Sequence, residues 1–512
     1  MNTYDPDILN TFRAAVHDVT LKESGNIHEG TKISELGLDS AALMELIGIL
    51  EETLSIRIKN EETAILNSVG DLLKLVCTRM PHQKSGAPMQ IRRPGNNSNK
   101  WNRVSGNGSC WDIAQFPEVK RLGQRLYEFD RLGIRNPYFE VHDSIARNRT
   151  IIGGVEMLNF SSYNYLGFSG HPEVMIAAKE AIDRYGTSVS ASRLVSGERP
   201  IHRRLEKALA EHIGVEDAVV FISGHATNVT TIGHLFDRND LILHDSLSHD
   251  SVIQGIYLSG AKRKSFPHGD MDYLEKMLEQ IRGRYRRVLI CSEGLFSMDG
   301  DICDLPRLIE IKKRFRCNLI IDEAHSIGVL GPAGRGVSHH FPDIDQTDVD
   351  LWMGTLSKSL ASCGGYIAGS KSLVRYLKFT APGFLFSVGM SPPIAAAALK
   401  SLELMHQYPE LVETLRRRSK LFLDQARANG INTGNSVGVA VIPAIIGDSM
   451  TCIRASQALA AKRINVQPII YPAVEENAAR LRFFISATHS EEEILFGVNA
   501  LAEELNKQSA AK

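Results

Sequence analysis

The sequence lacks an excess of either charge. Its 58 lysine and arginine residues are balanced by 59 aspartate and glutamate residues, so the formal net charge at pH 7 is −1. Nucleic-acid binders usually present a basic surface, and this balance argues against DNA or RNA as a partner. No apolar run approaches the roughly 20 residues that cross a bilayer. The acidic residues 1–7 lack the basic and apolar regions of a secretory signal, so we expect neither a membrane span nor a leader.

Cysteine is sparse, and no two cysteines form a CxxC pair. Scattered cysteines in an odd number are typical of reduced thiols rather than of a disulfide framework. The sequence therefore predicts a cytoplasmic protein without a metal centre. The seven cysteines are residues 77, 110, 291, 303, 317, 363 and 452.

A chain of 512 residues is too long for one hydrophobic core. Residues 1–79 have the pattern of a small helical unit. Residues 80–111 are rich in Pro, Gly, Asn, Ser, Lys and Arg without periodicity, which predicts a flexible linker. Such a coil of roughly 30 residues spans about 30 Å, enough for the first unit to reach a pocket on the next. The remainder is expected to form a large domain, residues 112–395, and a smaller C-terminal domain, residues 396–512.

Ser40 is the most informative residue of the first unit. Apolar residues recur at helical spacing after it, which places Ser40 at a helix start, where it could be an ordinary N-cap. However, Leu-Gly-Leu-Asp-Ser at residues 36–40, the following helix and residues 68–73 together resemble an acyl carrier protein domain, with Ala41 in place of the usual Leu. The resemblance implies a 4'-phosphopantetheine arm on Ser40, attached by a phosphopantetheinyl transferase. A helix N-terminus suits the anionic phosphodiester of this arm.

From residue 112 onward, helical segments alternate with short, almost wholly apolar strands. This pattern predicts an α/β fold with a mostly parallel sheet covered by helices on both faces. Polar residues or glycine follow four of these strands, and ligands collect at the carboxyl ends of strands in such sheets. Side chains from distant parts of the chain are therefore expected to share one cleft. The best strand candidates are residues 218–222, 241–243, 287–291, 318–321 and 365–368.

The C-terminal part has a mixed pattern. A long helical stretch is expected over about residues 394–429, after two consecutive prolines. It is followed by a strand at residues 481–485 and a helix from Glu491. These elements predict a smaller domain that closes over the large one.

Lys358 is well placed for chemistry, because it stands among small and hydroxylated residues just before a Gly-Gly turn and an apolar strand. Asp322 follows a strand, with His325 three residues later, and a buried carboxylate can keep a nitrogen heterocycle protonated. The turn at residues 223–228 could hold a phosphate at a helix N-terminus, and His249 could stack on a flat ring. Taken singly, each residue also has an ordinary explanation: a solvated lysine, an N-cap aspartate, a common turn or a packing histidine.

Six segments taken together carry more information than any one of them. They are residues 159–167, 224–225, 248–249, 293–300, 322–328 and 354–359. In order and spacing they resemble the α-oxoamine synthases, pyridoxal-phosphate enzymes that include serine palmitoyltransferase, aminolevulinate synthase, aminooxononanoate synthase and ketobutyrate ligase. The resemblance covers about residues 112–505, and its Ser-Tyr-Asn-Tyr-Leu-Gly and Asp-Glu-Ala-His-Ser-Ile-Gly forms are nearest to the serine palmitoyltransferase branch. It implies pyridoxal-phosphate fold type I, which is aminotransferase-like, with a smaller α+β C-terminal domain.

The resemblance also implies a catalytic set that binds the cofactor. Lys358 would bond to the cofactor's aldehyde and later act as a base, while Asp322 would pair with the pyridine nitrogen. His249 would stack on the ring face. His325 and Ser297 would contact the ring hydroxyl.

The same resemblance implies contacts at the two ends of the site. Gly224, His225 and Thr355 would bind the cofactor's phosphate. Arg482 matches the arginine that grips the amino acid's carboxylate, for which a planar fork with two donors is well suited.

One position departs from the family. Where a Thr-Ser or Asn-Ser pair usually reaches the phosphate from the partner subunit, this chain has Ser387 followed by Val388, which has no side-chain donor. The backbone or Ser387 would have to supply that contact. Because the site of this family lies at a dimer interface, we still predict a homodimer.

The resemblance implies a decarboxylative Claisen-type condensation of glycine, alanine or serine with an acyl thioester, giving an α-amino ketone in a secondary-metabolite or lipid-like pathway. The fused carrier indicates that the acyl group arrives on Ser40, loaded by an upstream acyl-loading or polyketide synthase enzyme. Two alternatives stay open: an aminotransferase that acts on a carrier-bound substrate, and a non-catalytic carrier scaffold. His249 weighs against the first, since aminotransferases typically stack an aromatic side chain there, and intact Lys358, Asp322 and Arg482 weigh against the second.

Overall fold

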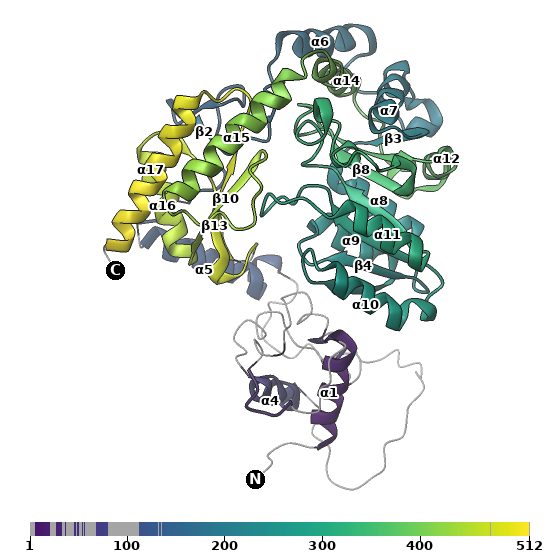
Figure 1. Cartoon of the computed structure of the whole chain (residues 1–512), viewed down its shortest axis with the longest axis vertical. Coiled ribbons are helices and arrows are strands. Elements are labelled where there is room, and N and C mark those ends of the chain that lie inside the picture. Colours follow the sequence, from purple (N-terminus) through teal and green to yellow (C-terminus); the bar gives the residue numbers. More distant parts are fainter. Residues whose placement is uncertain are drawn as a thin grey trace. The chain divides into compact units, whose positions relative to one another are not determined.

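The computed structural model divides into two compact units, residues 1–136 and residues 137–512 (Figure 1). It describes residues 6–20, 27–32, 36, 46–47, 49–50, 54, 56, 68–79, 112–131, 133–134, 136–471 and 473–510. The finer division at residues 79, 111 and 395 stays a prediction. Among the helices of the described residues, none is both long and apolar enough to cross a membrane.

The described part of the first unit contains a buried hydrophobic cluster. Phe12 and Leu72 lie in it with Leu46 and Ile47, all nearly or fully inaccessible to solvent. The burial of Leu46 and Ile47 agrees with the apolar period expected after Ser40, which itself lies outside the described residues. The helices among the described residues of this unit are α1 (Pro6–Thr20), α4 (Val69–Arg79), the 3-10 turn η2 (Ile113–Gln115) and α5 (Pro117–Arg131).

Helix α4 begins with a reciprocal pair of hydrogen bonds. The backbone N–H of Asp71 donates to the hydroxyl of Ser68 at 3.2 Å, and the backbone N–H of Ser68 donates to the carboxylate of Asp71 at 3.0 Å. This capping box satisfies N–H groups at the helix start that have no partner within the helix.

A seven-stranded sheet forms the core of the second unit, in the order β3-β9-β8-β7-β6-β4-β5. Only β9 runs antiparallel to its neighbours, so the prediction of a mostly parallel sheet is confirmed. All five predicted strands are present within two residues of their expected bounds. The edge strand β5 was not predicted, because it is only partly buried and lacks an apolar run. The strands are β3 (Asp217–Phe221), β4 (Leu241–Asp245), β5 (Lys262–Phe266), β6 (Val288–Glu293), β7 (Asn318–Asp322), β8 (Leu351–Thr355) and β9 (Gly365–Gly369).

Helices cover both faces of this sheet (Figure 1). Leu289 and Ile320 point to one face, where they join a buried cluster with Ile232 of α8 and Val252 of α9. Ile290 points to the opposite face and is equally buried, because successive side chains of a strand alternate. The helices of this region are α6 (Pro172–Tyr185), η3 (Arg193–Gly197), α7 (Pro200–Ile213), α8 (Gly224–Leu235), α9 (Asp250–Ser259), α10 (Met271–Ile281), η4 (Arg282–Arg284), α11 (Leu305–Phe315), η5 (Pro332–Gly334), η6 (Val337–His339), η7 (Gln346–Asp348), α12 (Lys371–Thr380), α13 (Pro382–Leu385) and α14 (Pro392–Gln407).

The C-terminal part adds two small sheets, β10-β13-β12 and β1-β2-β11. The expected strand near residues 481–485 and the helix from Glu491 are both present, and α15, α16 and α17 gather around β10 and β13 (Figure 1). Strand β2 pairs in parallel with β11, which joins residues 155–159 to the C-terminal part. The elements are β1 (Arg149–Ile152), β2 (Val155–Asn159), α15 (Glu410–Ala428), β10 (Val441–Gly447), α16 (Ser449–Ala461), β11 (Ile464–Asn465), β12 (Pro468–Ile469), η8 (Glu476–Ala478), β13 (Ala479–Phe484) and α17 (Glu491–Ala510).

The expectation of one helical stretch over residues 394–429 is wrong in one respect. The structure has two helices there, α14 and α15, which are separated at Tyr408 and Pro409. Tyr408 has φ −122° and ψ 63°, outside the helical region. Proline disfavours a helical conformation in the residue before it and lacks the N–H that would continue the ladder, so the chain breaks at this point.

Candidate active site

A cavity of about 350 Å³ opens where β6, β7 and β8 end. All nine residues that the resemblance implicates in the catalytic region line it, although they come from segments far apart in the chain. They are Gly224, His225, His249, Ser297, Asp322, His325, Thr355, Lys358 and Arg482. The tenth predicted site residue, Ser40, lies outside the described residues.

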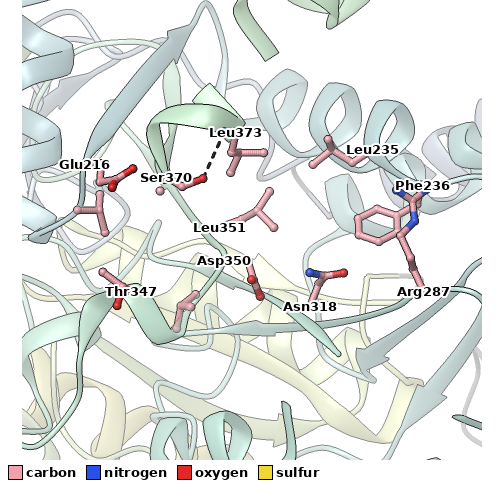
Figure 2. A pocket seen from close by; sticks show the side chains of 13 residues that line it. Glu216, Leu235, Phe236, Arg287, Asn318, Thr347, Asp350, Leu351, Ser370 and Leu373 are labelled. Atoms are coloured by element: carbon pink, nitrogen blue, oxygen red, sulfur yellow. Dashed lines mark hydrogen bonds between the residues drawn. The ribbon is translucent and has the colours of Figure 1, made fainter. Parts of the chain in front are cut away.

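A larger cavity, about 440 Å³, lies at the amino ends of β7 and β8 in the same sheet. Figure 2 shows the side chains that line it. It is lined by Asn318 and Leu351 at the starts of β7 and β8, and no lysine, histidine or cysteine is among its lining residues. Its arginine, Arg287, is already paired with Asp240 at 2.7 Å. Because ligands of open α/β sheets bind at the carboxyl ends of the strands, we place the active site in the smaller cavity.

Lys358 lies in the turn that follows β8. Its Nζ is 5.8 Å from the centre of the Tyr163 ring. Burial lowers the pKa of Lys358 to about 8, and the nearby carboxylates of Asp322 and Glu293 oppose this shift without cancelling it. About a tenth of the amine is therefore unprotonated at pH 7, far more than for a solvated lysine, and this neutral form is the one that acts as a nucleophile or a base.

Asp322, the last residue of β7, is buried with both carboxylate oxygens engaged. Oδ1 accepts a hydrogen bond from the N–H of Ala324, and Oδ2 accepts one from the side-chain amide of Asn228, each at 2.9 Å. Glu293 stands beside it at the end of β6, where burial and the charge of Asp322 raise the pKa of Glu293 to about 8. Glu293 therefore carries a proton near neutral pH.

His249 caps the start of α9, and its backbone N–H donates to Glu293 at 2.7 Å. Its Nδ1 lies 3.2 Å from the backbone nitrogen of Ser251 and 2.8 Å from the Ser251 hydroxyl. Burial lowers the pKa of His249, which favours a neutral imidazole. Burial and the charges of Lys358 and Arg482 likewise lower the pKa of His325 well below its usual range.

The first turn of α8 and the end of β8 meet closely. A Cβ atom on Gly224 would lie 2.9 Å from Oγ1 of Thr355, so only glycine allows this approach. The Thr355 hydroxyl lies 2.6 Å from that of Ser357. Free N–H groups at a helix start, together with two hydroxyls, form a suitable cradle for a phosphate.

Arg482 of β13 reaches the cavity from the C-terminal part. Its Nη1 donates to the backbone carbonyl of Ser297 at 3.0 Å, which ties the two parts together. Its Nε is buried and has no hydrogen-bond partner within the described part of the chain. A buried guanidinium donor without a partner suits an incoming carboxylate.

The segment around Val388, where the sequence departs from the family, lies on the surface of this chain. The side chains of Phe386 and Val388 are 89% and 47% exposed. Gly389 allows close packing, because a Cβ atom there would lie 2.8 Å from the Arg193 side chain. The role of this segment toward a partner subunit stays a prediction.

Comparisons with known proteins identify the family of this chain. Residues 155–501 match the family model of class I and II aminotransferases, and residues 10–76 match that of the phosphopantetheine attachment site. Over 373 residues the chain is 39% identical to an 8-amino-7-oxononanoate synthase of Symbiobacterium thermophilum, which covers 73% of this chain and 94% of the relative. The chain belongs to the α-oxoamine synthases.

Solved structures of α-oxoamine synthases share the fold. The serine palmitoyltransferase of Sphingomonas wittichii superposes with a TM-score of 0.74 at 27% identity, covering 78% of this chain and 99% of that one. The 8-amino-7-oxononanoate synthase of Francisella tularensis gives a TM-score of 0.60 at 25% identity over 69% of this chain and 99% of that one. The expected pyridoxal-phosphate fold type I is thereby confirmed. The nearness to the serine palmitoyltransferase branch stays a prediction.

Membership in this family makes pyridoxal phosphate the cofactor of the synthase and phosphopantetheine the cofactor of the carrier domain. The cavity fits the former. Gly224 begins helix α8 close to Thr355, and the N-terminus of a helix favours a phosphate. The buried carboxylate of Asp322 suits a protonated ring nitrogen.

Sequence reasoning assigned no role to several polar residues that the structure places at this site. Asn228 and Ser251 line the cavity with Glu293, and the Tyr165 hydroxyl touches His325. Asn228 stands four residues after Gly224 on the same helix face, which is the spacing that could have indicated it. Tyr165 lies within residues 159–167, one of the six segments that carry the resemblance, which could have indicated it. No comparable local signal distinguishes Ser251.

Proposed function

We propose that this α-oxoamine synthase condenses glycine, alanine or serine with an acyl thioester carried on its own Ser40 arm. A carbon–carbon bond forms between the amino acid's α-carbon and the thioester carbonyl, and the thiol leaves with a proton. The bond to the carboxylate then breaks, carbon dioxide is released, and a proton takes its place. The product is an α-amino ketone. The observation that supports carrier delivery is the presence of both family matches, residues 10–76 and residues 155–501, in one chain.

In this proposal the catalytic residues surround the amino acid's α-carbon. Pyridoxal phosphate, when bound, withdraws electrons from that carbon and makes its proton acidic. Lys358 would hold the cofactor through its aldehyde until the amino acid takes that place. The amine so freed would then remove the proton, a task for which its lowered pKa of about 8 is suited. Asp322 keeps the ring nitrogen protonated. His249 covers the ring face, and neutral His325 donates to the ring hydroxyl together with Ser297.

The remaining residues orient the reactants. Gly224, His225 and Thr355 hold the phosphate in the cradle at the start of α8. Arg482 binds the substrate carboxylate through the guanidinium edge that has no partner among the described residues. By holding the carboxylate, Arg482 would orient the amino acid in the cavity.

Carrier delivery changes how the acyl donor is supplied. A donor tethered in the same chain reaches an effective concentration of order millimolar, without requiring affinity for free coenzyme A. The proposal includes a homodimer, modification of Ser40 by a phosphopantetheinyl transferase, and an upstream enzyme that loads the acyl group.

A single-turnover experiment tests carrier delivery. The full-length protein, pantetheinylated and acylated on Ser40, is mixed with carboxyl-labelled glycine, alanine or serine. Intact mass and released carbon dioxide are then followed together. We expect loss of the acyl mass and release of label with the same rate constant for one of the three amino acids. An aminotransferase would leave the label in the amino acid's carbon skeleton.

Ser40→Ala is the matched variant, since it removes the arm and leaves the synthase cavity intact. It should bind pyridoxal phosphate like the unchanged protein but release no carbon dioxide under loading conditions. Normal turnover of carrier-borne acyl groups by Ser40→Ala would refute delivery from the chain's own arm. Lys358→Ala, loaded in the same way, should keep its acyl mass.

A further inference from the structure

Asn228 occupies an unusual position for an amide. It lies in α8 with 1% of its surface exposed, and its Nδ2 is 2.9 Å from both Asp322 Oδ2 and Ser251 Oγ. An amide nitrogen carries two hydrogens, so both bonds form at once. The flipped amide would place an oxygen against the Asp322 carboxylate, and this repulsion fixes the orientation.

The chain of hydrogen bonds extends from Asn228 through Ser251 to His249. The Ser251 hydroxyl accepts from Asn228, so its own hydrogen is free to donate to Nδ1 of His249, 2.8 Å away. The backbone N–H of Ser251 donates to the same nitrogen at 3.2 Å. Nδ1 is therefore an acceptor, and the proton of the neutral imidazole is on Nε2.

We propose that Asn228 is a positioning residue that couples Asp322 to His249. It holds the carboxylate that faces the ring nitrogen and, through Ser251, sets the tautomer and orientation of the imidazole that covers the ring. The inference rests on the proposed roles of Asp322 and His249. It does not depend on how the acyl group is delivered.

The other end of the amide supports this assignment. Oδ1 of Asn228 is buried and has no hydrogen-bond partner among the described residues. A buried, unsatisfied carbonyl costs free energy that a leucine of similar volume would avoid. Stability alone therefore does not explain an amide at this position. Its two N–H donors, which bond to Asp322 and Ser251, do explain it.

The test measures binding of pyridoxal phosphate to the full-length protein, by titration and by the visible circular dichroism of the bound ring. Asn228→Leu should raise the dissociation constant about tenfold or more, the effect of losing a hydrogen bond to a charged group, and weaken the dichroic band. Thr231→Val is the matched control, because it removes another buried and unpartnered polar atom from the same helix. It should stay within about twofold of the unchanged protein.

Two further variants keep the inference falsifiable if Asn228→Leu folds poorly. Ser251→Ala should alter the dichroic band more than the affinity. In Asn228→Asp, a protonated acid can still donate to Asp322, but an ionised one repels it. As the pH rises, its affinity should therefore fall more steeply than that of the unchanged protein, which has the same neighbouring titratable groups Glu293, His249 and Lys358.

Wild-type affinity and dichroism in Asn228→Leu would overturn the inference, and so would an unaltered pH dependence in Asn228→Asp. Since no acyl donor is present in these measurements, failure of carrier delivery would leave their outcome unchanged.

Discussion

The hydroxyl of Tyr165 lies 2.7 Å from Nδ1 of His325, across 160 residues of sequence. Burial raises the pKa of Tyr165 well above its usual range, so the phenol keeps its proton. Its hydroxyl has no other hydrogen-bond partner among the described residues, and it therefore donates to His325. Nδ1 of His325 is then an acceptor, and its Nε2–H is left to donate in the cavity.

We predict that Tyr165→Phe weakens pyridoxal-phosphate binding several-fold and lowers the free energy of unfolding by about 1 kcal/mol, the net contribution of one hydrogen bond. Tyr366→Phe is the control. Tyr366 is equally buried, but its hydroxyl has no partner within the described part of the chain, so its removal should be neutral or stabilising. Cofactor titration and denaturant unfolding measure both effects. Equal losses in the two variants would contradict the role given to Tyr165.

Lys358 should make the cofactor-free protein less stable at neutral pH. Its pKa is about 8 in the folded chain against 10.5 for an unperturbed lysine, so the unfolded chain binds more protons between these pH values. Stability therefore rises as the pH increases from about 8 to about 10.5, and below that window the charged amine costs about 3 kcal/mol. Lys358→Met removes this cost.

Thermal unfolding across pH measures this difference in the cofactor-free protein. Lys358→Met should be more stable than the unchanged protein at pH 7. This difference in stability should disappear as the pH rises from about 8 to about 10.5. The exposed Lys420 provides the comparison, since Lys420→Met should show no such pH-dependent gap. A difference in stability that stays constant with pH would exclude the lowered pKa of the buried amine as its cause.

Arg482→Lys tests the carboxylate grip. Lysine keeps the charge but replaces the planar fork by a single point donor. The KM for the amino acid should therefore rise by about tenfold or more, while the affinity for pyridoxal phosphate stays unchanged. Steady-state kinetics with the amino acid varied, together with a cofactor titration, separate the two effects. An unchanged KM would show that another group binds the carboxylate.

Gly224→Ala tests the phosphate cradle. The added Cβ would meet Oγ1 of Thr355 at 2.9 Å and its Cβ at 3.2 Å, and a β-branched side chain yields little. Helix α8 or Thr355 must shift, and we expect the dissociation constant of pyridoxal phosphate to rise roughly tenfold. In Gly233→Ala, on the same helix, the three atoms nearest the added Cβ all belong to the side chain of Leu258, so this variant should lose stability without losing cofactor affinity. Similar affinities in both variants would contradict the cradle.

Much of the second unit was predictable because its signals are local. The apolar runs of β4, β6 and β7 indicate burial on both faces of the sheet. The polar residues directly after them mark the carboxyl ends of the strands, where ligands bind. Motif order then indicated Lys358 and Asp322 with the other seven residues that line the cavity. The break at Pro409 was missed, although proline is itself a local signal, because the flanking segments both have helical periodicity.

The partner of each buried polar group was decided only by the tertiary structure. Asn228 meets Asp322 across 94 residues of sequence, and Tyr165 meets His325 across 160. Periodicity shows which face of a helix or strand is buried. The approach of two polar atoms depends on how α8 and the segment that contains Tyr165 pack against the ends of the strands. The sequence by itself thus determined the parallel sheet and the chemical groups of the site. Packing decided their hydrogen bonds, and with them the tautomers and charges that the proposed reaction requires.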